Sequence, residues 1–206
     1  DELMVAFEIH SVDRIRAVLD AGFDVRQPVN GTLPVTSLLE MYYRSDRFPD
    51  CLRLLLDRGA TLEDPLILPV LLDDAELLQK SLEQSPALLT HRTTLVSAFT
   101  PLVGASLLHV AAEYGNIRVA RALLAAGAEV DARAAVDDAG LNGHTPLFHT
   151  VNSNGNRSEP VMRLLLAAGA RIDVRLAGIT WGRGFDKVIM TMGVGDGAAL
   201  GQAFWL

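Results

Sequence analysis

Five histidines are the side chains of this sequence best suited to chemistry, because an imidazole can carry a proton or bind a metal. They are His10, His91, His109, His144 and His149. A zinc site needs several Cys or His ligands at matched spacing. His144 and His149 are five positions apart, which does not place them on one helical face as a four-residue step would. We therefore expect no metal site and no cofactor.

A glycine-rich segment near the end of the sequence is the second feature that could do chemistry. Residues 187–192 read as a strand, and residues 193–198 match the G-x-G-x-x-G/A pattern of phosphate-binding loops. A dinucleotide site would also need a helix, a second parallel strand and an acidic residue about 20 residues further on, and the sequence ends at Leu206. We expect instead an irregular or partly disordered tail, whose last apolar residues can fold back as a lid.

Paired acidic residues and the single cysteine give no catalytic pattern either. Asp73 with Asp74, and Asp137 with Asp138, are expected at solvated loop ends. No Ser-His-Asp, paired-carboxylate or Cys-His set can be assembled from the spacing, so we expect no enzymatic activity. Cys51 excludes an intramolecular disulfide and suits a reducing compartment. We expect it to be packed or inert.

A sequence motif that recurs along the chain indicates the elements that position these residues. Residues 106–115 read SLLHVAAEYG and are followed by ALLAAGA at 122–128; a second version has TPLF at 145–148 and LLLAAGA at 164–170. A hydroxyl residue suits a helix N-cap, proline suits the first helical position, and glycine suits a helix end. Each copy predicts two short helices, which must stack on a neighbouring pair to bury their apolar sides.

This motif resembles the ankyrin repeat, whose period is about 33 residues. The resemblance implies an all-α solenoid of helix-turn-helix repeats joined by finger loops. It also implies that His109, in the histidine position of the family, links neighbouring loops through hydrogen bonds. A protein of this kind is expected to bind another protein, which the resemblance does not name.

Helix-ending glycines set the register of the repeats. Gly22, Gly59, Gly127 and Gly169 each follow an apolar helix pattern. Gly59 and Gly127 lie 68 residues apart, so one degenerate repeat is expected between them, with Ser85 in the glycine position. We expect a domain over residues 1–174 made of five repeats, at about 1–25, 26–62, 63–95, 96–132 and 133–174. Residues 175–206 would form a degenerate sixth repeat or an irregular C-terminal cap.

Three departures from the family pattern are expected to alter the solenoid. Tyr42 and Tyr43 stand where the family prefers two alanines, so the first helix of the second repeat should sit farther out or turn its aromatic edges to solvent. The connection after Gly59 is too short for the usual finger loop, and Pro69 limits how the next helix begins. Extra residues within 134–143 predict an enlarged finger loop.

Composition and charge bound the class of protein. The chain has 206 residues, of which 50% are hydrophobic and 6% aromatic, and it has no apolar run long enough to span a bilayer. Its acidic start is unlike a secretory signal. A net charge of −7 argues against general nucleic-acid binding, which needs clustered Lys and Arg. We expect a soluble, cytoplasmic protein that binds neither nucleic acid nor membranes.

The resemblance also implies where a partner would bind. Ankyrin-type proteins generally use the finger loops and the exposed sides of the first helices, which together form a concave face. We expect Tyr114 to be exposed there rather than packed against a neighbouring repeat; for Trp181 both arrangements stay open. The expected partner-binding residues are Met41, Arg44, Val110, Glu113, Tyr114, Asn116, Asp137, Asp138, Leu141, Asn142, His149, Asn152, Ser153, Trp181 and Arg183.

Two functional interpretations follow from these features. The first is a protein–protein interaction module that acts as an adaptor, scaffold or inhibitor. The alternative is the repeat region of a longer multidomain protein whose activity lies outside this chain. The apolar end at Phe204, Trp205 and Leu206 predicts a monomer if it folds back as a lid. It predicts weak self-association through the C-terminal end if it does not, because terminal repeats normally need a polar outer face.

Overall fold

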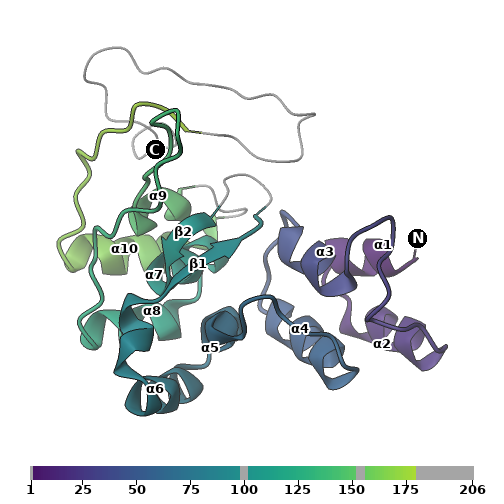
Figure 1. Ribbon diagram of the computed structural model, residues 1–206. Coiled ribbons are helices and arrows are strands. Elements are labelled where there is room, and N and C mark those ends of the chain that lie inside the picture. The colour runs from purple at the N-terminus through teal and green to yellow at the C-terminus, as the bar shows by residue number, and fades with distance from the viewer. Residues whose placement is uncertain (1, 98–101, 152–155, 180–206) are drawn as a thin grey trace.

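The computed structural model describes residues 2–97, 102–151 and 156–179, and most of these lie in short helices arranged in consecutive pairs (Figure 1). None of the helices in these ranges is long and apolar enough to cross a membrane. The pairs are α1 (Glu2–Glu8) with α2 (Val12–Asp20), α3 (Pro34–Glu40) with α4 (Phe48–Asp57), α5 (Leu68–Leu71) with α6 (Ala75–Gln84), α7 (Leu107–Tyr114) with α8 (Ile117–Ala125), and α9 (Pro146–Thr150) with α10 (Glu159–Ala167).

Neighbouring pairs stack on one another through equivalent helices. The first helix α1 packs on α3, and its partner α2 packs on α4. Further along, α5 packs on α7 and α7 on α9, while α6 packs on α8 and α8 on α10. Figure 1 shows the resulting row of pairs from the purple N-terminal end to the green end. Stacking of this kind buries the apolar sides of the pairs that it joins, as the stacking argument from the sequence requires.

Glycine ends the second helix of four pairs where the sequence predicts it. After α8, Gly127 has a φ of +92°, and the N–H of Ala128 bonds to the carbonyl of Leu123 at 2.9 Å. This is the Schellman arrangement, which needs a left-handed residue that only glycine adopts cheaply. The same bond and a positive φ occur at Gly22, Gly59 and Gly169. The predicted role of these four glycines is confirmed.

The third pair is short because of its prolines. A 3₁₀ turn, η1 (Pro65–Ile67), leads into α5, which has only four residues with Pro69 in second place. The carboxylate of Asp64 accepts a hydrogen bond from the N–H of Leu66 at 3.1 Å and so starts the turn. Residues 58–64, all of which the structure describes, contain no strand pairing. The expected missing finger and restricted helix start are confirmed.

The second pair differs from its prediction. Helix α3 ends at Glu40, and Met41 already has an extended conformation with φ −60° and ψ 136°. Tyr42 and Tyr43 therefore lie in the loop before α4 instead of on a displaced helix. The guanidinium of Arg44 donates hydrogen bonds to the carbonyls of Leu39, Met41 and Tyr43. It thereby satisfies the carbonyls that the shortened helix leaves free.

The fingers between the later pairs form one hydrogen-bonded layer. A 3₁₀ turn, η2 (Pro86–Thr90), precedes a hairpin of β1 (Arg92–Leu95) and β2 (Leu102–Ser106), which the sequence did not predict. Next to β2, the N–H of Ala135 bonds to the carbonyl of Val103 at 2.8 Å. The enlarged finger closes on itself through a bridge between Val136 and Asn142. Its far side bonds to residues 174–179, where the Asn142 N–H meets the Gly178 carbonyl at 2.8 Å.

Helix α7 lies at the centre of this arrangement. All eight of its residues are buried, because α5 and α9 pack on two sides, α8 covers a third, and β2 leads directly into its first turn. A helix that is buried all round has no free side for a partner. This observation bears directly on the binding surface expected from the sequence.

Candidate protein-interaction surface

Six of the expected partner-binding residues are buried. The exposed fraction is 0% for Val110, 7% for Glu113 and 2% for Tyr114, and the remaining three are Arg44, Asn116 and His149. The expectation that these side chains face solvent on a concave surface is wrong. Segments of the same chain cover several of them: the second pair contacts Tyr114, and Ser97, just after β1, contacts Glu113.

Tyr114 is buried because the second pair contacts it, through the end of α3, the following loop and the start of α4. Its hydroxyl donates a hydrogen bond to the carbonyl of Leu39 at 3.1 Å, and its ring centroid lies 5.0 Å from that of Phe48. The guanidinium carbon of Arg44 lies 4.3 Å from the ring centroid, a cation–π contact. Burial raises the pKa of the Tyr114 hydroxyl to about 12. Through these contacts α7 reaches the second pair directly.

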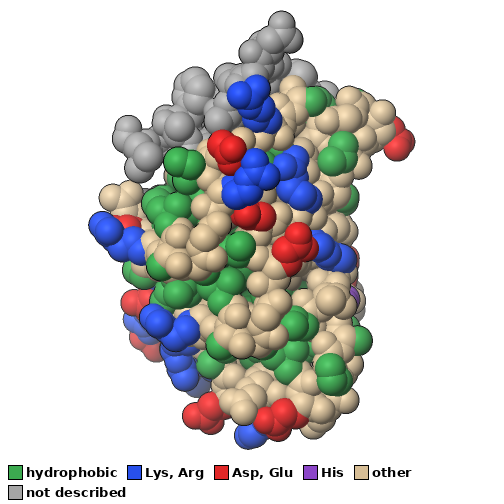
Figure 2. Space-filling model, turned by 90° about the vertical axis from the view of Figure 1, so that its left-hand side faces the viewer, with side chains coloured by type: hydrophobic (Ala, Val, Ile, Leu, Met, Phe, Trp, Pro, Cys, Tyr) green, Lys and Arg blue, Asp and Glu red, His purple; other side chains and the backbone are tan. Residues whose placement is uncertain are grey.

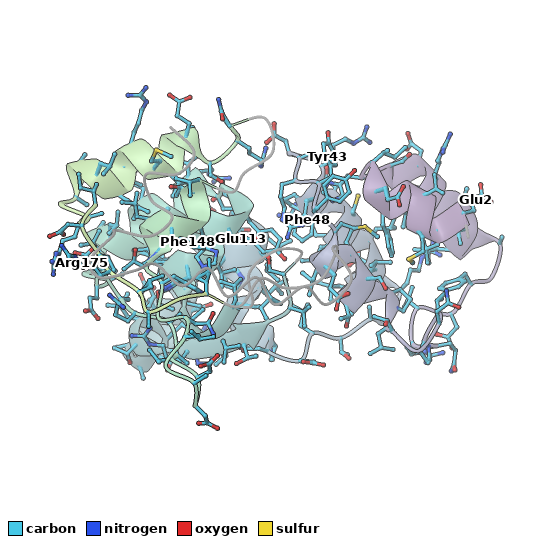
Figure 3. The ribbon with its side chains drawn as sticks, turned by 90° about the horizontal axis from the view of Figure 1, so that it is seen from above. Glu2, Tyr43, Phe48, Glu113, Phe148 and Arg175 are labelled. Carbon is cyan, nitrogen blue, oxygen red and sulfur yellow. The ribbon has the colours of Figure 1, made fainter. Side chains whose placement is uncertain are left out.

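Glu113 is the centre of a buried polar network. Its carboxylate accepts hydrogen bonds from the hydroxyl of Ser97 at 2.6 Å and from Nδ1 of His149 at 2.9 Å, and the Arg44 guanidinium lies 3.8 Å away. Burial alone would raise the pKa of Glu113, but the bond and charge of His149, together with Arg44 and Ser97, outweigh it and hold the pKa below its usual value. Figure 3 shows Glu113 beside Phe148, with Phe48 between them and the first pair.

The histidines extend this network into the next pair. Nε2 of His149 lies 3.0 Å from Nδ1 of His144. The carboxylate of Glu113 can only accept, so Nδ1 of His149 carries the proton of that bond. His109 accepts the N–H of Ser106 at Nδ1 (3.1 Å) and donates from Nε2 to the carbonyl of His144 (3.0 Å). It therefore joins the start of its own helix to the finger of the next pair.

The hydrogen bonds of this network connect its residues in a different order from those of a catalytic triad. A nucleophilic serine passes its proton to a histidine, which a carboxylate orients from the other side. Here the Ser97 hydroxyl donates directly to Glu113, and His149 contacts the other carboxylate oxygen. Ser97, Glu113 and His149 are all buried. Among the described residues, no group of three or more His, Cys, Asp or Glu side chains could hold a metal ion.

Residues in and next to the turns between helices form hydrogen bonds that connect different pairs. Asn116 donates from its amide to the Val70 carbonyl at 2.7 Å, so its side chain holds the third and fourth pairs together. Arg157, before α10, donates to the carbonyl of Tyr114 at 3.3 Å and to the carboxylate of Asp46 at 2.5 Å. Arg157 and Asp46 are 111 positions apart, so the fifth pair reaches back to the second.

In the described part of the chain, the enlarged finger holds most of the expected binding residues that remain accessible. Asp137 and Asp138 are exposed, and Leu141 and Asn142 are half-buried. Asp137 also builds the tip: its carboxylate accepts the N–H groups of Ala139 and Leu141 at 3.0 and 2.9 Å and the amide of Asn142 at 3.1 Å. The loop is thus fixed by its own hydrogen bonds while its end faces solvent.

A comparison with family models decides the class of this stack. The model of ankyrin repeats matches residues 72–175 as three copies. The chain belongs to the ankyrin repeat family. No curated protein matches it. Ankyrin repeats are generally protein–protein interaction modules and are typically not catalytic. The predicted resemblance is therefore confirmed.

Within the ankyrin pattern, one departure accounts for the buried network. His109 occupies the family's histidine position and links neighbouring fingers as that position implies. In the next repeat Phe148 takes this position, and His149 stands one residue later, where the preceding repeat has Val110. A histidine at an apolar position of a stacked helix needs a buried partner, which Glu113 provides. This shift was the sequence signal for the network.

The other expected site residues fall into two groups. Met41 is half-buried beside the shortened end of α3. Asn152, Ser153, Trp181 and Arg183 lie outside the residues that the structure describes, as do the glycine-rich segment 193–198 and the apolar end of the chain. Cys51 is buried in α4, and burial raises its thiol pKa to about 11.

Proposed function

We propose that this ankyrin-repeat chain is an adaptor, scaffold or inhibitor that binds a partner protein chiefly through its finger loops, without catalysis of its own. The helix caps at Gly22 and Gly59 support counting the first two pairs as repeats as well. The proposed solenoid then has five repeats, at 1–25, 26–62, 63–95, 96–132 and 133–174, with 175–206 as its cap.

The enlarged finger is the observation that carries this proposal. Val136 is 56% exposed beside the exposed carboxylate of Asp138. Asp137 holds the tip in one conformation through the bonds described above. A loop that is ordered before binding loses little conformational entropy when a partner docks. An exposed apolar side chain beside an acidic one offers a partner both contact area and a charge to match.

The buried ankyrin positions move the proposed contact surface away from the first helices. Of the residues first expected to bind, Met41, Asp137, Asp138, Leu141 and Asn142 stay accessible in whole or in part. The acidic tip and the net charge of −7 favour a protein partner with a basic patch over nucleic acid. We place this interaction in the cytoplasm.

The last described repeat supports a monomer or a weak self-association at the C-terminal end. Its outward side carries Leu166, 42% exposed, and Ile172, 65% exposed. Figure 2 looks onto this end of the stack and shows hydrophobic side chains in patches between charged ones. Patches of this kind are too broken up for a strong dimer but suit weak contacts.

Affinity capture from the lysate of the source cells tests the proposal. Three baits are compared: the unaltered chain, the double variant Val136→Asp/Asp138→Lys, and the control Glu8→Lys on the exposed end of α1. Circular dichroism must show the same helix content for all three. A protein retained by the first and third baits and lost from the second supports finger-loop binding. Equal retention by all three baits, or no retained protein, contradicts it.

A further inference from the structure

The finger layer has one gap, and it lies at the third repeat. The connection between the first two pairs carries a bridge between Val29 and Thr32, and the later connections carry the β1–β2 hairpin and the bridge between Val136 and Asn142. Residues 58–64 are fully described and carry no such pairing. The finger that would stand in front of β1 is therefore absent from this chain.

This gap leaves one edge of β1 without a neighbouring strand among the described residues. β1 pairs only with β2 in a two-stranded sheet, and the other side of β2 continues to Ala135. The chain before the gap touches β1 through side chains at one end, where the carboxylate of Asp64 meets Nε2 of His91 at 2.7 Å. A free strand edge presents backbone N–H and C=O groups that can pair with another extended chain.

A small apolar groove of about 50 Å³ lies between α3 and the end of β1. Val35 and Leu39 of α3 form one wall, Leu95 and Val96 form the other, and Leu62 and Ile67 complete the lining. From β1 the groove is lined by Thr94 and Leu95, and none of its lining residues belongs to β2. Its volume suits one aliphatic side chain and excludes a cofactor. Val96, one of the lining residues, is 40% exposed.

The charge at the groove is acidic. Glu63 and Asp64 are its only charged lining residues. Asp64 is already bonded to His91 and to the N–H of Leu66, whereas Glu63 is exposed. A bound chain would therefore meet the unpaired carboxylate of Glu63 beside the apolar groove.

We propose that this groove binds an extended segment of a partner protein, which pairs with the free edge of β1, places one aliphatic side chain between α3 and β1, and sets a Lys or Arg against Glu63. This is strand addition, in which backbone bonds give affinity and the pocket for alternate side chains gives selectivity. The proposal rests on the function proposed above and adds a second contact, with stated chemistry, to that of the enlarged finger.

Seven-residue peptides displayed on phage and selected against the full chain provide the test. Selected peptides are expected to combine alternating aliphatic residues with a Lys or Arg. In amide NMR spectra, a bound synthetic peptide should shift and protect residues 94–96 and shift residues 35–39. Glu63→Lys should weaken binding about tenfold, since it turns an attraction at an exposed rim into a repulsion. Replacing the basic residue of the peptide by Glu should then restore binding to the Glu63→Lys chain, and Glu8→Lys should change nothing.

Three results would overturn the groove assignment. The first is selected peptides that bind Glu63→Lys as well as the unaltered chain and shift other residues. The second is the absence of any selected peptide. The third is a dimer seen by light scattering whose interface protects residues 94–96, which would make a second copy the occupant. None of these affects the capture experiment with Val136→Asp/Asp138→Lys, so failure of the groove and failure of the interaction function can be told apart.

Discussion

Replacing Glu113 by alanine distinguishes the observed structure from the surface expected on sequence grounds. If this side chain were exposed on a concave face, the substitution would change the free energy of unfolding by less than about 0.5 kcal/mol. In the structure its carboxylate is buried and accepts bonds from Ser97 and His149, with Arg44 close by. Its removal leaves three polar partners buried without their acceptor.

The expected cost follows from those contacts. A hydrogen bond to a charged group contributes about 1.5 to 3 kcal/mol, and removing one member of a buried ion pair costs about 3 to 5 kcal/mol. These figures describe overlapping contacts and are not summed. We expect Glu113→Ala to lower the free energy of unfolding by about 4 kcal/mol. Glu113→Gln keeps the shape and one acceptor oxygen, so we expect about half that loss.

Urea unfolding followed by circular dichroism measures this cost. With a slope of about 2 kcal/mol per molar urea, Glu113→Ala should move the midpoint down by about 2 M, and the exposed control Glu8→Ala should leave it in place. A double-mutant cycle with His149→Ala should give a coupling free energy above about 1 kcal/mol. A midpoint for Glu113→Ala close to that of the unaltered chain would refute the buried network.

Three further predictions follow from buried groups and backbone conformation. Burial, with the charge of His149, lowers the pKa of His109 to about 3, against about 6.5 in the unfolded chain. As the pH falls below 6.5, only the unfolded chain takes up this proton, so the free energy of unfolding falls by about 1.4 kcal/mol per pH unit, or about 2 kcal/mol at pH 5. His109→Gln should remove this part of the pH dependence of the urea midpoint. Gly115 and Gly127 both have positive φ, but a Cβ at Gly115 would lie 3.1 Å from Arg157 and 3.2 Å from Ser158, whereas one at Gly127 meets nothing within 4 Å. Gly127→Ala should lower the free energy of unfolding by about 1 kcal/mol, and Gly115→Ala should lower it clearly more. Thermal unfolding that ranks the two variants in the opposite order would contradict the contact at Gly115. The Cys51 thiol, with its pKa raised to about 11 by burial, should stay unreactive toward an aromatic disulfide reagent at pH 8 in the folded chain and react fully in concentrated urea; rapid reaction of the folded chain would show that α4 opens.

The features that were predictable from the sequence depend on one residue and its immediate neighbours. A glycine after an apolar helix is sufficient to predict a left-handed cap, and Gly22, Gly59, Gly127 and Gly169 all have one. Pro69 restricts the start of α5 in any surroundings. His109 forms its bonds to the first turn of its own helix and to the next finger. Local chemistry of this kind needs no knowledge of distant segments.

The burial of Tyr114 and Glu113 was not predictable in this way. It depends on contacts between segments that are far apart in the sequence. Leu39, near the early end of α3, accepts the bond of the Tyr114 hydroxyl, and the Arg44 side chain lies over the Tyr114 ring. The β1–β2 hairpin was missed for a similar reason, because the long segment before Ser106 has no Asn-Gly or Asp-Gly turn to indicate it.

The bond between Arg157 and Asp46 has a consequence for how the chain unfolds. A simple stack of repeats touches only nearest neighbours, so it can fray one unit at a time from either end. Here the second pair is bound to the fourth through Tyr114 and Leu39 and to the fifth through this ion pair. The second, fourth and fifth pairs therefore each have a contact to a pair that is not their neighbour, and the third pair lies between them in the stack. We expect these pairs to melt as one cooperative unit and to fold more slowly than a linear array of the same length, since contacts 75 and 111 positions apart must form.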